Sequence, residues 1–231
     1  GSRVLALDLD GGAAADLAGE LPGDGHAGAA IDVTDRDSCA AAAGPAGGAA
    51  GEPPCTAVVY AAGIAVTADV AVHDPDDWRR TLAVNLDGAF HVGQAFVRPM
   101  LAAGTPGAFV YLSSVAGRRG EAGAAAYCAS KFGLIGLVES FAAELTEAGI
   151  RVNAVCPGNV DSPLLRAVSQ DIAAREDRDA EAVYAEHARI GAARRLVDPA
   201  EVASACLWLC SSGASGVTGT TLTVDVGAMI G

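Results

Sequence analysis

The sequence predicts an α/β fold, a doubly wound parallel sheet between two layers of helices. Short, almost wholly apolar runs alternate along the chain with longer helical patterns, as in βαβ units whose strands are buried on both faces. A length of 231 residues fits one domain. Hydrophobic residues make up 51% of the chain, which is enough to bury a core. We therefore expect one three-layer α/β/α domain over residues 1–231.

The first half of the chain contains three predicted strands and two helices. The strands span residues 4–7, 29–31 and 57–60, and the helices span residues 13–21 and 35–43. Asp35 suits the start of the second helix because its carboxylate can accept backbone N–H groups. The Gly, Ala and Pro tract at 44–54 is predicted as a solvent loop. Its glycines precede a strand instead of joining a strand to a helix, which argues against a phosphate loop.

The second half follows the same alternation with longer helices. The predicted helices span residues 75–103, 124–148 and 199–210, and the predicted strands span residues 108–112, 151–155 and 221–224. Ligands of an open parallel sheet bind outside the carboxyl ends of its strands. The residues directly after each strand are therefore the first candidates for a functional site.

Charge and cysteine usage exclude several classes of function. The formal net charge of -13 argues against a nucleic acid or an anionic membrane as partner. No apolar run reaches the roughly 18 residues that span a bilayer, and no signal-peptide pattern is present. The six cysteines form no CxxC pair and no His lies at zinc-ligand spacing, so we expect no metal site. Free thiols in a reducing cytoplasm are the expected state.

One group of polar residues is placed as reacting groups would be. Tyr127 and Lys131 are spaced i, i+4 on a predicted helix, so both side chains lie on one face. That pair alone is a weak signal, since an exposed pair on a solvated face has the same spacing. Ser114 follows the strand at 108–112, and Asn85 interrupts an apolar stretch of the preceding long helix. Small residues at 61–63 end the third strand, where a ligand can approach the backbone closely.

In order and spacing, these residues resemble the short-chain dehydrogenase/reductase family over nearly the whole chain. The matching segments are Tyr127-Cys128-Ala129-Ser130-Lys131 for YxASK, Ser114 for the serine thirteen residues earlier, Asn85 for the helix asparagine, Tyr60-Ala61-Ala62-Gly63 for NNAG, Pro157-Gly158-Asn159-Val160-Asp161-Ser162 for PGxVxT, and residues 217–227 for TGxxxxVDGG. The resemblance implies a Rossmann-like sheet. It also implies transfer of a hydride between a nicotinamide cofactor and a small secondary alcohol or ketone.

Each of the four matching polar residues then has an expected role. Tyr127 is the expected acid or base, and a free phenol needs help at neutral pH because its pKa is about 10. The Lys131 ammonium favours phenolate, and by resemblance it also hydrogen-bonds the nicotinamide ribose. Ser114 would donate to the substrate oxygen. Asn85 would hold a water in a proton relay.

Asp8 directs the cofactor prediction. A carboxylate directly after the predicted strand at residues 4–7 can accept hydrogen bonds from both ribose hydroxyls and would repel a 2′-phosphate. This favours NAD over NADP. The alternative is that Asp8 or Asp10 only caps the next helix. By resemblance, the further cofactor contacts are Asp32, Val33, Ala61, Ala62, Gly63, Tyr127, Lys131, Pro157, Gly158, Val160 and Ser162.

The substrate side is predicted from the long, charged segment at 164–196, which in the family is a lid over the substrate. Its length resembles dehydrogenases of small diols, hydroxyketones or polyols. We expect His187 at a surface position of this segment rather than against substrate. The two long helices at 75–103 and 124–148 form the family's usual subunit contact, so a homodimer or homotetramer is expected.

The largest departure from the family lies at the N-terminus. The first strand and the TGxxxGxG loop have no counterpart, because residues 1–4 align with the start of the family's second strand. In the family that first strand lies at the centre of the sheet, so a gap is expected there. Three explanations stay open: a missing upstream segment, with Gly1-Ser2 as a possible cloning remnant; a rearranged short protein; or loss of redox chemistry. The alternative function is accordingly a protein without dinucleotide binding, acting as a scaffold or a non-redox enzyme such as a dehydratase, epimerase or cyclase.

Overall fold

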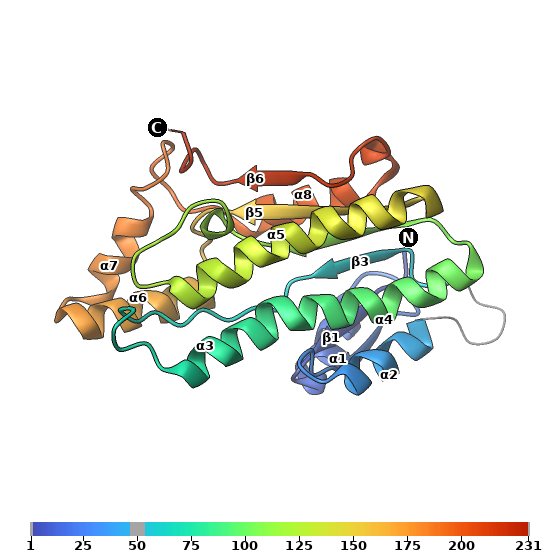
Figure 1. Ribbon diagram of the computed structural model, residues 1–231, viewed down its shortest axis with the longest axis horizontal. Coiled ribbons are helices and arrows are strands. Elements are labelled where there is room, and N and C mark those ends of the chain that lie inside the picture. The colour runs from blue at the N-terminus through green and yellow to red at the C-terminus, as the bar shows by residue number, and fades with distance from the viewer. Residues whose placement is uncertain (1, 47–53, 231) are drawn as a thin grey trace.

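The structure, a computed structural model, describes residues 2–46 and 54–230 (Figure 1). Its strands are β1 Leu5–Asp8, β2 Ala27–Ala30, β3 Ala57–Tyr60, β4 Gly107–Leu112, β5 Ile150–Pro157 and β6 Thr221–Val224. Its α-helices are α1 Gly11–Glu20, α2 Arg36–Ala46, α3 Pro75–Leu82, α4 Gly88–Ala103, α5 Ala125–Leu145, α6 Pro163–Glu176, α7 Ala180–His187 and α8 Pro199–Cys210. Each predicted strand and helix is present within a few residues of its expected bounds.

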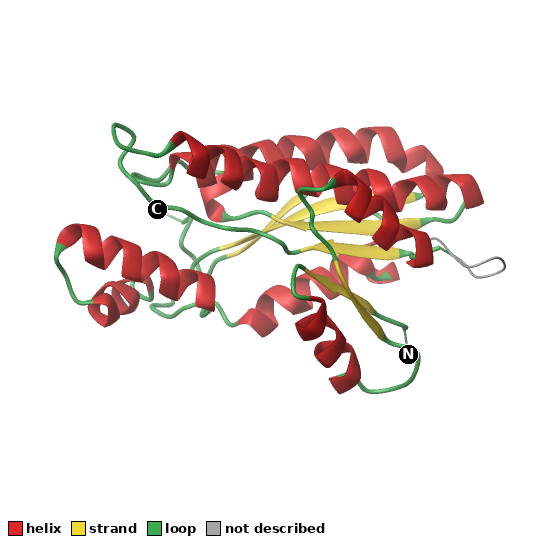
Figure 2. Cartoon of the chain, turned by 90° about the horizontal axis from the view of Figure 1, so that it is seen from below, coloured by secondary structure: helices red, strands yellow, loops and turns green. Residues whose placement is uncertain are grey.

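The strands form two parallel sheets. β3, β4, β5 and β6 lie side by side in that order, with Tyr60 opposite Tyr111 and Leu112 opposite Val155. β1 and β2 pair only with each other, and Figure 2 shows this short sheet set apart from the four-stranded one. The parallel strands are as predicted, and the sheet is interrupted between β1 and β3, where the sequence predicts a gap.

The four-stranded sheet is covered on both faces, as predicted. Phe109 and Tyr111 of β4 belong to a core cluster with residues of α4 and α5. Val110 of the same strand belongs to a second cluster, with Leu209 of α8. Successive residues of a strand point to opposite faces, so α4 and α5 lie on one face and α8 on the other (Figure 1).

The edge of the sheet at β3 is partly open on the α8 side. Val59 is 48% exposed and Leu207 of α8 is 72% exposed. Both line an apolar cavity of about 500 Å³. The break in the sheet therefore leaves apolar surface uncovered beside β3.

The long helix predicted at 75–103 is not uniform. It consists of α3, a π-helical turn at Ala83–Asp87, and α4. Single π-turns inside helices often accompany functional residues, and this one contains Asn85. The helix predicted at 124–148 is α5 followed by a 3₁₀ turn at Thr146–Ala148, and it ends where Gly149 takes a positive φ of 74°.

Three further sequence expectations concern local structure. Asp35 precedes α2 and accepts the backbone N–H of Asp37, as a capping residue does. α2 continues to Ala46, so the predicted loop at 44–54 begins later than expected, and residues 47–53 lie outside the described residues. The segment predicted as a lid forms α6 and α7, which pack against each other.

Two features are absent from the residues that the structure describes. No helix in this part of the chain combines the length and the apolar character needed to cross a membrane. Among the same residues, no group of three or more His, Cys, Asp or Glu side chains is arranged to hold a metal ion. The six cysteines are free thiols.

Candidate active site

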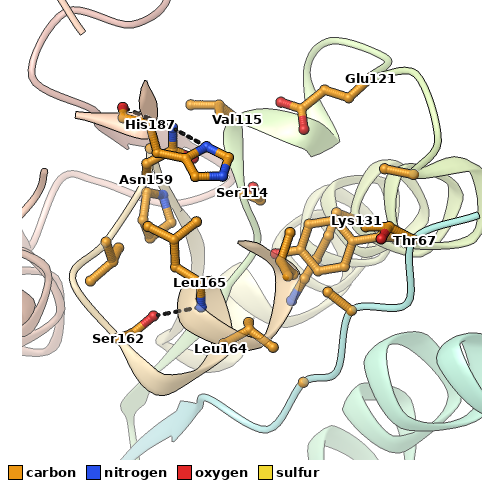
Figure 3. A pocket seen from close by; sticks show the side chains of 18 of the residues that line it. Thr67, Ser114, Val115, Glu121, Lys131, Asn159, Ser162, Leu164, Leu165 and His187 are labelled. Carbon is orange, nitrogen blue, oxygen red and sulfur yellow. Dashed lines mark hydrogen bonds between the residues drawn. The ribbon is translucent and has the colours of Figure 1, made fainter. Parts of the chain in front are cut away.

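A cavity of about 280 Å³ lies at the carboxyl ends of β3, β4 and β5, under α6 and α7. This is the edge at which an open parallel sheet binds ligands, and Figure 3 shows its lining. Nine residues singled out from the sequence line it together: Ala61, Gly63, Ser114, Tyr127, Lys131, Pro157, Gly158, Val160 and Ser162. The structure thus brings three of the four predicted reacting groups and eight of the twelve predicted cofactor contacts into one space.

Lys131 is buried in the wall of this cavity, with 4% of its surface exposed. Its Nζ donates a 2.8 Å hydrogen bond to the carbonyl oxygen of Leu112, the last residue of β4. Desolvation lowers the Lys131 pKa to about 8. The ammonium uses one of its three donors in this bond, which leaves two for a ligand.

Tyr127 lies one turn before Lys131 on α5, and Lys131 Nζ is 5.6 Å from the centre of its ring. Burial raises the pKa of the Tyr127 phenol to about 12, and the Ser114 hydroxyl opposes that rise. Without further positive charge, the phenol therefore stays protonated at neutral pH. That state suits an acid, whereas action as a base requires its pKa to fall.

Ser114 is held by the turn that follows β4. Its Oγ accepts the backbone N–H of Ala116 and so caps the 3₁₀ turn Val115–Gly117. The neighbouring Ser113 Oγ donates to the carbonyl oxygen of Lys131, which ties the end of β4 to α5. The capping bond leaves the Ser114 hydroxyl proton free to be donated into the cavity.

Asn85 is fully buried and joins three segments. Its Oδ1 accepts the Ile64 N–H, and its Nδ2 donates to the Ile64 carbonyl and to Ser130 Oγ, each at 2.9 Å. Both side-chain donors are therefore in use. Any water that Asn85 holds must use the second lone pair of Oδ1 or its backbone, and the relay role stays a prediction.

Two glycines of the cavity are small for different reasons. A Cβ on Gly63 would lie 3.5 Å from both Asn85 Oδ1 and Lys131 Nζ, in space that a ligand can use. A Cβ on Gly158 would lie 3.0 Å from the Asp225 Cα, so this glycine lets the segment after β5 pack against the segment after β6. With the free Lys131 donors, Gly63 fits a nicotinamide and its ribose.

The residues predicted to hold the adenosine half lie outside the cavity. Asp10 is the N-cap of α1 and accepts the N–H groups of Gly12 and Ala13. Asp8 ends β1, is exposed, and accepts the Asp10 N–H at 2.9 Å. Asp10 is thus the residue that caps α1. Asp8 stabilises the turn through its Oδ1 and has its second carboxylate oxygen available for a ligand. The predicted ribose contact of Asp8 stays a prediction.

The other adenosine-side residues are also placed by local contacts. The Asp32 carboxylate accepts the N–H and the hydroxyl of Thr34, and these bonds lower its pKa. Val33 and Ala62 pack against the core cluster. The structure leaves their predicted cofactor contacts untested.

Several lining residues were not predicted as site residues from the sequence, among them Thr67, Glu121, Asn159 and His187. The expectation that His187 lies on the surface is wrong, because α7 turns its side chain into the cavity beside Asn159 (Figure 3). Thr67 comes from the loop after β3, and Glu121 from the loop before α5. Loop positions carry no periodicity, so only the position after each strand could have pointed to Thr67 and Asn159.

The chain is similar in sequence to a known reductase family and to several dehydrogenases. Residues 1–229 match the sequence profile of a family described as enoyl-(acyl carrier protein) reductase. The chain is 38% identical to the inactive 2-(S)-hydroxypropyl-CoM dehydrogenase 2 of Xanthobacter autotrophicus, with 98% of this chain and 95% of that protein covered. It is 36% identical to galactitol 2-dehydrogenase (L-tagatose-forming) of Cereibacter sphaeroides, with 98% and 85% covered.

Solved structures agree with these relatives over the whole chain. Sorbitol-6-phosphate 2-dehydrogenase from Erwinia amylovora superposes with a TM-score of 0.92 at 28% identity, covering 100% of this chain and 91% of that one. Gluconate 5-dehydrogenase from Burkholderia cenocepacia, solved with NADP and tartrate, gives 0.88 at 29% identity, covering 100% and 87%. Carveol dehydrogenase from Mycobacterium avium, solved with NAD, gives 0.88 at 26% identity, covering 100% and 90%.

Proposed function

The chain belongs to the short-chain dehydrogenase/reductase family, and from that premise we propose that it is an NAD-dependent oxidoreductase acting on a small secondary alcohol or its ketone. One observation carries the proposal: Ser114, Tyr127 and Lys131 line a single cavity at the sheet edge where ligands bind. A descendant without this chemistry would have no need for a buried lysine beside a partly buried tyrosine in this cavity. The substrate type is a diol, hydroxyketone or polyol.

Residues of the chain itself transfer the proton and hydrogen-bond the substrate oxygen. Ser114 donates its free hydroxyl proton to that oxygen and fixes its position. In the oxidative direction Tyr127 Oη accepts the hydroxyl proton, and in the reductive direction it gives the proton back. Lys131 supplies the positive charge that lowers the phenol pKa toward the working range. A nicotinamide bound beside them supplies the two-electron acceptor or donor.

The residues that would hold the nicotinamide half are those around the two glycines. Lys131 has two free donors for the ribose hydroxyls, and Gly63 leaves room for the ring and its carboxamide. Ser162 is the N-cap of α6, where its Oγ accepts the Leu165 N–H at 3.3 Å, and its hydroxyl proton is available to the carboxamide.

The preference for NAD over NADP rests on Asp8. Its exposed carboxylate stands after β1 with an oxygen free for ribose hydroxyls, and it would repel a 2′-phosphate. Relatives have been solved with either dinucleotide, so this choice is specific to the chain. Asp8→Ala is expected to reduce the ratio of NAD to NADP affinity.

Two further parts of the proposal concern the protein's surroundings. Phe90 of α4 and Phe132 of α5 are 41% and 47% exposed, as expected of helices that pair with another copy in a homodimer or homotetramer. The free thiols of all six cysteines favour a reducing compartment, the cytoplasm.

A second candidate, a family member that does not hold dinucleotide, has its own supporting observation. A relative that is 38% identical over 98% of this chain is itself named an inactive dehydrogenase. Such a protein would act as a scaffold or as a non-redox enzyme.

Titration of the chain with NADH, followed by nicotinamide fluorescence, separates the two candidates. Saturable binding below millimolar NADH supports the dehydrogenase, and absence of binding up to millimolar NADH favours the second candidate. If NADH binds, Tyr127→Phe is expected to abolish turnover and leave binding nearly unchanged. Turnover preserved in that variant would refute Tyr127 as the acid or base.

A further inference from the structure

Two polar atoms beside the cavity are buried and have no hydrogen-bond partner. They are Thr67 Oγ1 and His187 Nε2, both on residues that line the cavity with Tyr127 and Ser114. The great majority of buried polar atoms in folded proteins are paired. An orphaned pair beside a candidate reacting centre therefore indicates groups that a ligand satisfies.

Asn159 sets which imidazole proton faces the ligand. Its Nδ2 lies 3.4 Å from His187 Nδ1 and donates to the His187 carbonyl oxygen at 3.2 Å. An amide nitrogen only donates, so His187 Nδ1 is the acceptor and the proton resides on Nε2. Burial lowers the His187 pKa, with Glu186 opposing, which keeps the ring neutral. His187 thus offers one N–H donor.

Thr67 offers a hydroxyl from the other side of the cavity. Figure 3 places Thr67 near Lys131, across from His187, Asn159 and Leu165. The Thr67 loop is fixed by the neighbouring Ala68 N–H, which donates to the Gly123 carbonyl oxygen at 2.8 Å. A hydroxyl both donates and accepts, so it can pair with another hydroxyl.

The charge of the cavity excludes acidic ligands. Among its described lining residues, Lys131 is the only one with a cationic side chain, and its donors are committed to Leu112 and the nicotinamide ribose. Glu121 also lines the cavity. A phosphate or carboxylate on the substrate would therefore be buried near a carboxyl group without a cation to pair with it.

We propose that Thr67 and His187 are specificity-determining residues that select an uncharged polyol by hydrogen-bonding hydroxyl groups on either side of the reacting carbon. The reacting carbon itself is that of the proposed function, on which this inference rests. Asn159 is a positioning residue that acts through His187. The structure thus favours polyols over phosphorylated or acidic sugars and over simple monoalcohols.

Binding is measured first, so that the outcome does not depend on turnover. The chain has four histidines, and loss of one imidazole signal in the NMR spectrum of His187→Gln would assign the signal of His187. The protein with NADH is titrated with the pentitols xylitol, ribitol and arabinitol, with the matching pentonates, and with 3-pentanol. We expect the best pentitol to bind roughly tenfold or more tightly than its pentonate and than 3-pentanol, and to shift the His187 signal.

Matched variants separate recognition from structure. Thr67→Val and His187→Phe should each weaken pentitol binding by roughly 10- to 100-fold and leave 3-pentanol binding unchanged. Thr67→Ser and His187→Gln should restore much of the pentitol affinity, since each keeps a hydrogen-bonding group. Thr81→Val is the control, because Thr81 Oγ1 is also buried without a partner but does not line the cavity.

Three results would overturn this inference: equal binding of pentitols and 3-pentanol, tighter binding of pentonates, or pentitol affinity unchanged in both variants. Where turnover occurs, the two variants should raise KM for the pentitol much more than they lower kcat. If pentitols bind as expected but no alcohol is oxidised with NAD, only the proposed redox function fails.

Discussion

Lys131 Nζ lies 5.6 Å from the centre of the Tyr127 ring, and the two side chains share one buried wall of the cavity. Burial lowers the pKa of the lysine to about 8 and raises the pKa of the tyrosine to about 12. Burial therefore favours the uncharged form of each group. Positive charge brought by an oxidised nicotinamide would tip the tyrosine toward phenolate, so proton transfer is coupled to cofactor binding.

Replacing Lys131 by methionine should stabilise the fold and remove activity. The folded pKa of about 8 lies below the usual 10.5, so the buried ammonium costs about 3 kcal/mol below pH 8. Lys131→Met removes that cost but also loses the bond to Leu112, so we expect an equal or higher Tm at pH 7, with no turnover.

The pH dependence of the unfolding free energy tests whether the lowered pKa of Lys131 causes this stabilisation. Between pH 8 and 10.5 the unfolded chain binds more protons at Lys131 than the folded chain, so wild-type stability rises with pH relative to that of Lys131→Met. Urea unfolding of both proteins at pH 7 and pH 9.5 measures this. A stability gap that stays constant between the two pH values would contradict the assigned lysine pKa.

Oxidised cofactor should make one tyrosine ionise at lower pH. The chain has four tyrosines, and burial is the largest cause of the raised pKa of each one. The free protein should therefore show little tyrosinate absorbance up to about pH 10. Adding NAD should produce the absorbance of one tyrosinate, and Tyr127→Phe should abolish that change. The same change in the variant would assign it to another tyrosine.

Removing the Asn85 side chain should loosen the loop after β3. Asn85→Leu leaves the N–H and carbonyl of Ile64 without their side-chain partner, at an expected cost of about 2 to 4 kcal/mol in the free energy of unfolding. Urea unfolding gives the value. Asn159→Leu, which breaks the part-buried bond from Asn159 to the His187 carbonyl of α7, is the matched control and should cost less. Equal losses in the two variants would refute the special role of the Asn85 bonds.

A carboxylate introduced on α5, one of the two helices of the proposed subunit contact, should dissociate the oligomer. Phe132 of α5 is 47% exposed, and Phe132→Asp would bury a carboxylate in the proposed subunit contact. Sedimentation should then show a monomer in place of a dimer or tetramer. Val70→Asp, at a loop position that is 83% exposed, should leave the assembly unchanged. A wild-type monomer at micromolar concentration would exclude the contact altogether.

Periodicity and motif spacing brought together the residues that we propose as catalytic. Tyr127 and Lys131 share a helix face because they are one turn apart, and Ser114 follows β4 by sequence adjacency. These relationships are local, so the sequence contains them directly. The helix boundaries were less certain: nothing in the run at 75–103 indicated the π-turn, which is accompanied by the bonds of Asn85 to Ile64, 21 residues away.

The sequence by itself determined the alternation of strands and helices, the parallel sheet, and the residues that meet at its carboxyl edge. Only the tertiary structure decided that Ala83–Asp87 form a π-helical turn and that His187 turns inward onto Asn159. It also decided that Asp10, and not Asp8, caps α1. The reason is physical: strand pairing, burial and the direction of a loop side chain depend on contacts between distant segments, which no local pattern specifies.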